Sequence, residues 1–346
     1  KNQQGKSPDG KTEFVLVSSY KELAQALKKK DTVIGIITIE GAHVLGGGTE
    51  IADKMKQEDF IQLLTKNIQA LKNWEHPPFM ITLSHHFWNH LAGHSKSMKR
   101  PINNVLNQNK GKNKGITEAG WHVIRELLST KNGKRILIDT KHMSAASRKE
   151  YYAFINNYNY VNPENKIPVV SSHACANGFK TIDSSIVKAD LIVKARKGRL
   201  YKWSINISDE EAKIIHDSEG LIGLMMDKGN MGGIDVVNEI SKEKDIKKQR
   251  KLYAQLFWDN AFQFVKAVDK KSGWDMIAVG TDFDGSITHM EPYPTAADLP
   301  QFQQDLLTFL EEKKYQQSLW FGYTPKEIVD KMMYGNAMDF YKKFFV

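Results

Sequence analysis

The sequence contains six short apolar runs rich in β-branched residues, and stretches with the periodicity of amphipathic helices separate each run from the next. Apolar runs of this kind, bounded by polar residues, glycine or proline, predict buried β-strands. Strands that alternate with helices form a parallel sheet covered by those helices, either doubly wound or closed as a (β/α)8 barrel. The six runs are residues 33–39, 79–83, 135–138, 168–170, 221–226 and 276–279.

Two of the intervening helices begin at recognisable capping residues. Thr117 precedes an amphipathic stretch that continues to residue 128, and Ser208 precedes the acidic first turn of the stretch 208–217. No repeat, low-complexity tract or Pro/Ser-rich linker divides the 346 residues. We therefore expect one domain, 1–346, with residues 184–204 as an insertion at its rim. The polar first fourteen residues are expected to form a loop or a mobile start.

The charge of the chain does not favour a nucleic-acid partner. Lys and Arg total 49 against 40 Asp and Glu, a formal net charge of +9, but the basic residues are scattered among acidic ones. A nucleic-acid face would gather them into a patch with interleaved aromatic residues. No run approaches the roughly 20 apolar residues of a transmembrane helix. The single cysteine, Cys175, excludes an internal disulfide.

Five of the six predicted strands end on side chains that can bind a metal ion. In a parallel barrel the carboxyl ends of the strands meet at one mouth, so residues far apart in sequence become neighbours there. Carboxylates and imidazoles are the ligands that Zn2+ and similar divalent ions use. In chain order these side chains are Glu40 and His43, then His85, His86 and His90, then Asp139 and His142, then His173, and finally Asp282 and Asp284.

Glu40 ends the first of the apolar runs. A carboxylate at the end of a buried strand is costly unless a cation or hydrogen-bond donors meet it. A metal ion above the sheet is one explanation, and a salt bridge to a loop Lys or Arg is the other. The recurrence of similar side chains at the other strand ends favours a shared metal site.

Simpler roles are favoured for several other residues. Asp282 is expected to bind metal or carry protons, whereas Asp284 with Gly285 is expected to make a turn. Cys175 is expected to be a small buried hydrophobe. The glycines after Glu40 are expected to adopt positive φ or to allow a close approach. The histidines in excess of one site, expected at the surface or in supporting positions, are His86, His90, His94, His122, His216 and His289.

Seven segments, in register from about Lys30 to the end of the chain, resemble the membrane (renal) dipeptidase family of metallopeptidases within the amidohydrolase-like superfamily. Six of them carry specific motifs of that family. The segments are "IEGAHVLGGG", "TLSHHFWNHLAGHS", "GITEAGWHVIREL", "LIDTKHMS", "PVVSSHACA", "VGTDFDG" and the closing "YGNAMDFYKKFF".

The resemblance implies a (β/α)8 TIM-type barrel and hydrolysis of a dipeptide or a similar small amide by a metal-bound hydroxide. Glu40 would bridge two divalent ions, usually zinc, and His142 and His173 would complete one of the two metal sites. Asp282 would serve the other ion and shuttle a proton. His85 would bind the substrate by polarising the scissile carbonyl or by holding the tetrahedral oxyanion.

Two features depart from the family pattern. The His-x-Asp motif of the family's first strand does not occur in the sequence, and six strands are recognisable where eight are expected. We expect the first one or two β/α units to precede Lys1. Ile205 lies where family dipeptidases place an Arg that pairs with the substrate carboxylate, which Ile cannot do. Lys180, Arg199 or Lys202 could replace that Arg.

Two hypotheses for the function follow. The first is a metallo-dipeptidase-like hydrolase with one or two divalent ions, zinc before others, and a small peptide-like substrate. The second is a catalytically degenerate barrel that acts as a binding protein, motivated by the absent motif and by Ile205. A homodimer is one open oligomeric state. Since family members occupy several compartments, the localisation does not carry over from the resemblance.

Overall fold

The computed structural model describes residues 5–7, 10–48, 50–98, 106–188, 198–313 and 317–346. Its main sheet has six parallel strands, each hydrogen-bonded to the next along the chain. A doubly wound sheet would reverse its strand order at a switch point, whereas a barrel adds strands in sequence. The strand order is therefore that of the barrel alternative and not that of a doubly wound sheet, and the six described strands form an open sheet. The strands are β4 (Thr38–Glu40), β5 (Met80–Thr82), β6 (Leu137–Asp139), β7 (Val170–Ala174), β8 (Leu221–Leu224) and β9 (Ile277–Val279).

The register aligns the strand ends at one level. Thr38 pairs with Met80, and Met80 pairs with Leu137, so β4, β5 and β6 run in step. In the described part of the chain β4 and β9 are the two edges of this sheet. Glu40 and Thr82, which are register partners, consequently lie at the same carboxyl-terminal rim.

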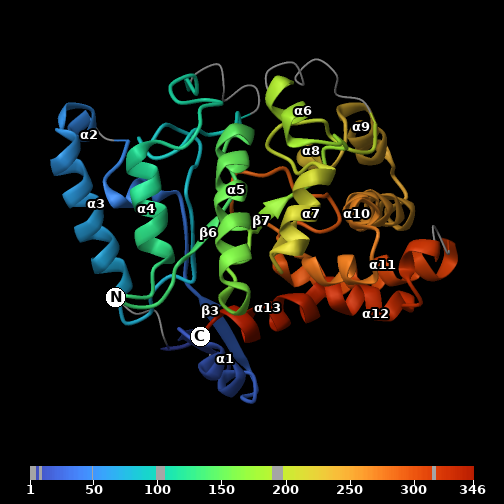
Figure 1. Ribbon diagram of the computed structural model, residues 1–346. Coiled ribbons are helices and arrows are strands. Elements are labelled where there is room, and N and C mark those ends of the chain that lie inside the picture. Colours follow the sequence, from blue (N-terminus) through green and yellow to red (C-terminus); the bar gives the residue numbers. More distant parts are fainter. Residues whose placement is uncertain (1–4, 8–9, 49, 99–105, 189–197, 314–316) are drawn as a thin grey trace.

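Helices connect consecutive strands and surround the sheet (Figure 1). The caps predicted at Thr117 and Ser208 are confirmed, because the Thr117 hydroxyl accepts from Gly120 N–H and Ser208 forms a capping box with Glu211. The helices that follow the main strands are α2 (Glu50–Lys54), α3 (Gln57–Lys72), α4 (Glu118–Leu128), α5 (Ala145–Val161), α6 (Ile182–Val187), α7 (Asp209–Asp217), α8 (Lys228–Met231), α9 (Ile234–Lys242), α10 (Ile246–Val268), α11 (Leu299–Lys313), α12 (Pro325–Asp330) and α13 (Asn336–Phe344).

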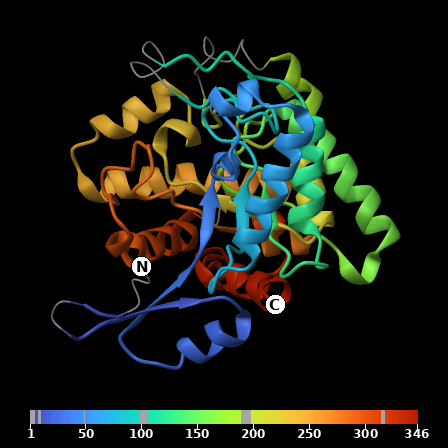
Figure 2. The same ribbon diagram turned by 90° about the vertical axis from the view of Figure 1, so that its left-hand side faces the viewer.

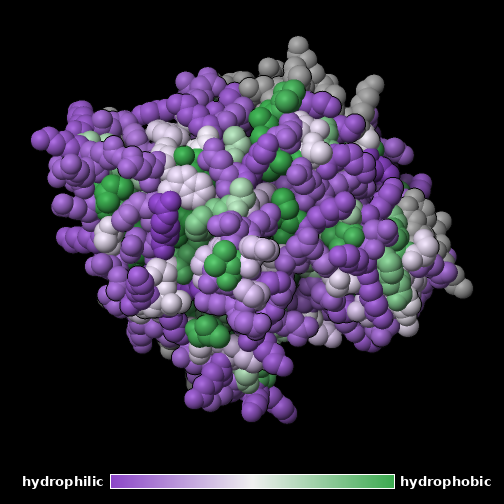
Figure 3. Space-filling view, in the orientation of Figure 1, coloured by the Kyte–Doolittle hydropathy of each residue, from purple (hydrophilic) through white to green (hydrophobic). Residues whose placement is uncertain are grey.

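The core lies between the strands and these helices. Ile81, Ile138, Ile222 and Ile277, from four different strands, have no exposed surface. On the outer side, a Trp258–Trp274 stack with ring centroids 5.1 Å apart joins α10 to the segment before β9. The surface in Figure 3 is mostly hydrophilic, with apolar residues in small patches. Among the described residues, no helix has the length and apolar character needed to cross a bilayer.

A small second sheet extends from one side of the barrel (Figure 2). It contains β1 (Gly5–Lys6), β2 (Glu13–Val17) and β3 (Thr32–Ile36), with α1 (Tyr20–Ala26) between β2 and β3. The prediction of one strand over 33–39 is wrong in this respect. The run is divided at Ile37, so that its first part pairs in parallel with β2 and its second part with β5.

The expected loop over the first fourteen residues is also wrong in part. Residues 5–6 pair with residues 13–14 in antiparallel fashion, because backbone pairing to β2 needs no apolar pattern in β1. Residues 1–4 and 8–9 lie outside the described part. The same holds for 189–197 within the insertion expected at 184–204. The flanking residues Phe179, Tyr201, Trp203 and Ile205 form a separate small apolar cluster.

A buried ion pair joins the segment after β6 to the start of α7. Arg148 Nε donates to Glu211 Oε1 at 2.6 Å, and the two side chains are 1% and 0% exposed. Arg148 also donates to the carbonyls of Met143 and Ser204, both at 2.8 Å. The guanidinium therefore holds together two loops at the carboxyl ends of the strands.

We expect Arg148→Met to lower the free energy of unfolding by about 3–5 kcal/mol, because it leaves the Glu211 carboxylate buried without its cation. The double variant Arg148→Met/Glu211→Gln should recover part of this loss. Urea unfolding measures both. Lys149→Met, which removes only an exposed pair with Asp183, is the control and should leave the stability nearly unchanged. Equal losses for the two single variants would contradict the prediction.

Candidate metal centre

The structure brings the five predicted site residues together at the carboxyl-terminal rim of the sheet. The carboxylate of Glu40 is central: its Oε1 lies 3.0 Å from His142 Nε2, 3.2 Å from His173 Nε2 and 3.6 Å from His85 Nε2. Asp282 Oδ2 lies 4.0 Å from His173 Nε2. A cavity of about 210 Å³ opens there, lined in part by Glu40, His173 and Asp282.

Three of the residues at this rim adopt a backbone conformation that side chains rarely take. His142, Asp282 and Asp284 have φ of 65°, 57° and 65°. Such left-handed residues cost free energy and persist where the surroundings impose them, often at functional sites. The turn expected at Asp284 is thus present, and Asp282 shares it, since Gly285 N–H donates to the Asp282 carbonyl at 3.0 Å.

The glycines after Glu40 make the first loop possible. Gly41 has a φ of 101°, as expected for this segment. A Cβ on Gly47 would lie 2.1 Å from the carbonyl oxygen of Asn89, so a side chain at position 47 cannot be accommodated. The close approach is between two loops of the chain, and it fixes the segment after Glu40 against the segment after His85.

The electrostatics of the centre favour a charged carboxylate beside neutral imidazoles. Burial acts to raise the pKa of Glu40, but the neighbouring imidazoles of His142 and His173 outweigh it and hold that pKa well below its usual range. Burial lowers the pKa of His142 far below its ordinary value and also lowers the pKa of His85. Burial raises the pKa of Asp282, which favours a carboxyl group able to exchange a proton.

The donor atoms fit a divalent cation. Ligand atoms of Glu40, His142 and His173 all lie within 4.8 Å of one another. The two Nε2 atoms are 3.3 Å apart, so two ring nitrogens and one carboxylate oxygen form a compact group of possible donors. One carboxylate and two neutral imidazoles are a common donor set for Zn2+ in catalytic sites. A cation placed among these three donors would be bound by all of them.

A hydrogen-bond chain orients His173 toward this position. The hydroxyl of Ser172 donates to Asp139 Oδ2 at 2.5 Å and lies 2.8 Å from His173 Nδ1. Because the single hydroxyl proton is used on Asp139, Ser172 accepts from the Nδ1–H of His173, which leaves the lone pair of Nε2 free to bind metal. Thr82 also donates to Asp139 Oδ2, at 2.8 Å.

Asp139 differs from the other strand-end carboxylates because it binds hydrogen-bond donors of the chain itself. It is 2% exposed, and its carboxylate accepts from Thr82, from Ser172 and from the backbone N–H of Lys141. The sequence placed Asp139 among the metal-capable residues but carried no signal for Ser172 and Thr82, other than the serine directly before His173. Their role becomes visible only when β5, β6 and β7 lie side by side.

Lys141 was also missed by the sequence analysis. Its side chain is 2% exposed, directly before His142. Burial lowers the pKa of Lys141, against the attraction of acidic groups that include Cys175, Asp282 and Asp139. A cationic side chain is therefore enclosed near the same rim. Cys175 itself is fully buried, as expected.

The histidines expected in supporting positions divide into two groups. Most have partners away from the centre: His90 pairs with Asp53, and His94 is buried against two backbone carbonyls. His43, one of the strand-end residues, contacts the Phe87 carbonyl at 3.1 Å. His122 contacts Thr65, and His216 contacts Asp217 and Ser272. His86 differs, because its ring lies 3.8 Å from that of His85, beside the centre. His289 forms an isolated backbone bridge with Asp227.

The surroundings of Ile205 are apolar. Its side chain is 4% exposed, in the cluster with Phe179, Tyr201 and Trp203. Of the three cations proposed to replace an Arg there, Lys180 pairs with Asp209 at 2.7 Å, and Arg199 pairs with Asp259. Lys202 is exposed. Two of the three candidates are thus already paired with carboxylates of the chain itself.

The chain of contacts from Asp139 to His173 gives a prediction for metal affinity. Ser172→Ala should weaken binding of Zn2+ about 10–100-fold, because it removes the partner that holds the His173 ring. Calorimetric titration of the metal-depleted protein measures this. Ser171→Ala is the matched control, since the neighbouring Ser171 hydroxyl is buried without a hydrogen-bond partner in the structure. A similar affinity for both variants would contradict this role of Ser172.

The loop after β9, which carries Asp282, is fastened through Glu291. Its carboxylate accepts from Lys228 and from the Tyr253 hydroxyl. Burial alone would raise the pKa of Glu291, but these bonds outweigh it and lower that pKa from 4.5 to about 2. A lowered pKa contributes stability that is present above pH 4.5 and is lost as the pH falls toward 2.

We expect Glu291→Gln to remove part of this contribution. Because the carboxylate is more than a third exposed, the loss near neutral pH should be about 1 kcal/mol, and stability should fall less steeply between pH 4.5 and the lowest pH tested. Urea unfolding across this pH range gives both quantities. Asp183→Asn, in an exposed pair with Lys149, serves as the control. An unchanged pH dependence in Glu291→Gln would argue against this anchor.

Comparisons with known proteins agree with this architecture. An amidohydrolase from Pseudomonas aeruginosa aligns with 96% of this chain and 79% of its own, at a TM-score of 0.56 and 16% identity. A metallo peptidase from Rhodobacter sphaeroides, solved with a phosphinate mimic of the dipeptide L-Ala-D-Ala, aligns with 96% of this chain and 69% of its own, at a TM-score of 0.53 and 14% identity. A dipeptidase of metallopeptidase family M19 aligns with 96% of this chain and 72% of its own, at a TM-score of 0.55 and 14% identity.

Likenesses at this level of identity establish the fold. No protein-family model matches the sequence, and no curated protein matches it. The expectation of a TIM-type barrel drawn from the sequence segments is met by the strand order and by these structures. The chain has the α/β-barrel fold of amidohydrolase and metallo-dipeptidase structures.

Proposed function

We propose that the protein is a metal-dependent hydrolase that cleaves an amide bond of a small peptide-like substrate. The observation that carries the proposal is that ligand atoms of Glu40, His142 and His173 lie within 4.8 Å of one another at the strand ends. The likeness in fold to metallo-dipeptidase and amidohydrolase structures supports the same reaction class. The segments that resemble membrane dipeptidases contain these three residues.

Glu40, His142 and His173 would hold the divalent cation, and zinc suits their oxygen and nitrogen donors. A bound ion of this kind polarises a carbonyl oxygen and lowers the pKa of a bound water. Asp282, whose pKa is raised by burial, would accept a proton and return it to the leaving amine. His85, kept neutral by burial, would donate a hydrogen bond to the carbonyl oxygen of the substrate.

The dimensions of the site favour a small substrate. The cavity at the strand ends has a volume of about 210 Å³, which suits a dipeptide or an acylated amino acid better than a folded protein. One of the similar structures was solved with a mimic of L-Ala-D-Ala. The apolar surroundings of Ile205 favour a substrate that does not need an Arg at that position to bind its carboxylate.

The centre is tested by Glu40→Gln. We expect the purified full chain to retain about one or two equivalents of zinc after dialysis, and the variant to lose the equivalent that Glu40, His142 and His173 would hold. Hydrolysis of a panel of dipeptides and N-acyl amino acids should fall about a thousandfold, since the metal contributes several kcal/mol to transition-state stabilisation. Plasma emission spectrometry and amine release measure the two effects.

His122→Gln is the control, because His122 contacts Thr65 away from the centre. Unchanged hydrolysis in Glu40→Gln, or a wild-type chain without stoichiometric metal, would overturn the proposal. Stoichiometric metal without hydrolysis of any substrate would favour the alternative, a barrel that serves as a binding protein. A single domain over 1–346 with an insertion at 184–204, and a homodimer, remain predictions.

A further inference from the structure

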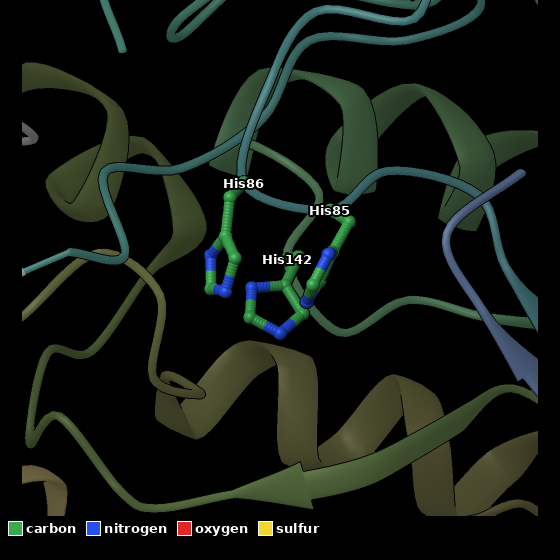
Figure 4. A group of neighbouring side chains, drawn as sticks. All are labelled: His85, His86 and His142. Carbon is green, nitrogen blue, oxygen red and sulfur yellow. The ribbon is translucent and has the colours of Figure 1, made fainter. Parts of the chain in front are cut away.

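A second group of metal-capable side chains lies directly beside the proposed centre. His85, His86 and His142 each offer a ring nitrogen, and the three nitrogens lie within 4.8 Å of one another. Figure 4 shows the three rings facing a common space, with His85 and His86 from the loop after β5 and His142 from the loop after β6. Neither the proposed hydrolysis nor the Glu40 centre requires His86.

The two nitrogens of His142 face different groups. Its Nε2 lies 3.0 Å from Glu40 Oε1, within the first group of ligands. Its Nδ1 is buried and has no hydrogen-bond partner among the residues that the structure describes. A buried polar atom without a partner is costly and calls for an explanation. Figure 4 shows a nitrogen of His86 facing His142 on this side, with the ring centroids 5.0 Å apart.

The orientation of His86 is set by a hydrogen-bond network of its own. His86 Nδ1 lies 2.6 Å from the Ser97 hydroxyl. Gln108 donates to that hydroxyl at 2.9 Å and to the His86 carbonyl at 2.7 Å, and it is 6% exposed. Because Nδ1 is occupied, the nitrogen turned toward His142 is Nε2. Metal-binding histidines are commonly fixed through their other nitrogen in this way.

The remaining ring completes the group. The ring centroid of His85 lies 4.6 Å from that of His142 and 3.8 Å from that of His86, with the planes of His85 and His86 tilted by 35°. The space among the three rings is therefore bordered by nitrogen donors from two loops whose positions are fixed by Ser97 and by the backbone of His142.

We propose that His85, His86 and His142 bind a second divalent cation, distinct from the one at Glu40. Three imidazoles select a nitrogen-preferring ion such as Zn2+, Co2+, Ni2+ or Cu2+ over Mg2+ or Ca2+. His142 contributes Nδ1 to this ion and, if the proposed function holds, Nε2 to the first. When both nitrogens bind metal, the remaining ring proton of His142 leaves to the solvent.

A cation at the second site would also affect hydrolysis, and this part of the inference rests on the proposed function. His85 is the side chain assigned to the substrate carbonyl, and a cation at the second site withdraws it from that task. Excess metal therefore inhibits hydrolysis. His86 has no part in the first centre, so its removal relieves the inhibition and leaves the reaction at low metal intact.

The test is titration of the metal-depleted protein with Co2+, followed by visible absorption and calorimetry. The wild type should bind two equivalents. His86→Gln should bind one, with the affinity of the second equivalent lowered at least a hundredfold, and Ser97→Ala should lower it about 10–100-fold. Glu40→Gln should lose the other equivalent and keep the one that depends on His86. His122→Gln should match the wild type.

The outcomes separate this inference from the proposed function. One equivalent in the wild type, retained in His86→Gln and lost in Glu40→Gln, overturns the second site and leaves the first. Two equivalents that both persist in His86→Gln and in Ser97→Ala also overturn it. Ser97→Ala keeps all three imidazoles, so it decides the matter if His86→Gln does not fold, which circular dichroism shows.

Discussion

The candidate metal centre depends on one interaction, the contact of the Glu40 carboxylate with the imidazoles of His142 and His173. A charged carboxylate at the end of a buried strand must be compensated, and here imidazoles from two other strand ends lie against it. The contact is possible because parallel strands in sequential order bring their carboxyl ends to one rim. The fold therefore concentrates otherwise costly groups in one place.

Two sets of buried polar contacts support the Glu40 contact, one at Asp139 and one at Arg148. Asp139 gathers hydroxyl and backbone donors, and through Ser172 it sets the ring of His173. Farther out, the buried Arg148–Glu211 pair joins the loop of Met143 to the start of α7. The side chains that would bind metal are thus held by buried hydrogen bonds. The loop of Met143 is also fixed to α7 through the buried ion pair. Such support is what keeps donor atoms aligned for a metal ion.

Much of the fold followed from the sequence, because alternation of apolar runs and amphipathic stretches is a local property. All six predicted runs overlap strands, and the caps at Thr117 and Ser208 lie where hydroxyl residues precede helices. Other features did not follow. The division of the first run at Ile37 depends on two different partner strands, and β1 has no pattern of its own. Pairing partners that lie far along the chain decide such features.

For the site, the sequence by itself determined which side chains stand at the strand ends, since each follows its own apolar run. The resemblance to membrane dipeptidases then singled out Glu40, His142, His173 and Asp282 among them. Only the tertiary structure decided their separate tasks. It enclosed Asp139 among donors, and it placed His86 against His85. The physical reason is that strand position is encoded locally, whereas hydrogen-bond partners come from neighbouring strands and loops that meet only when the barrel is wound.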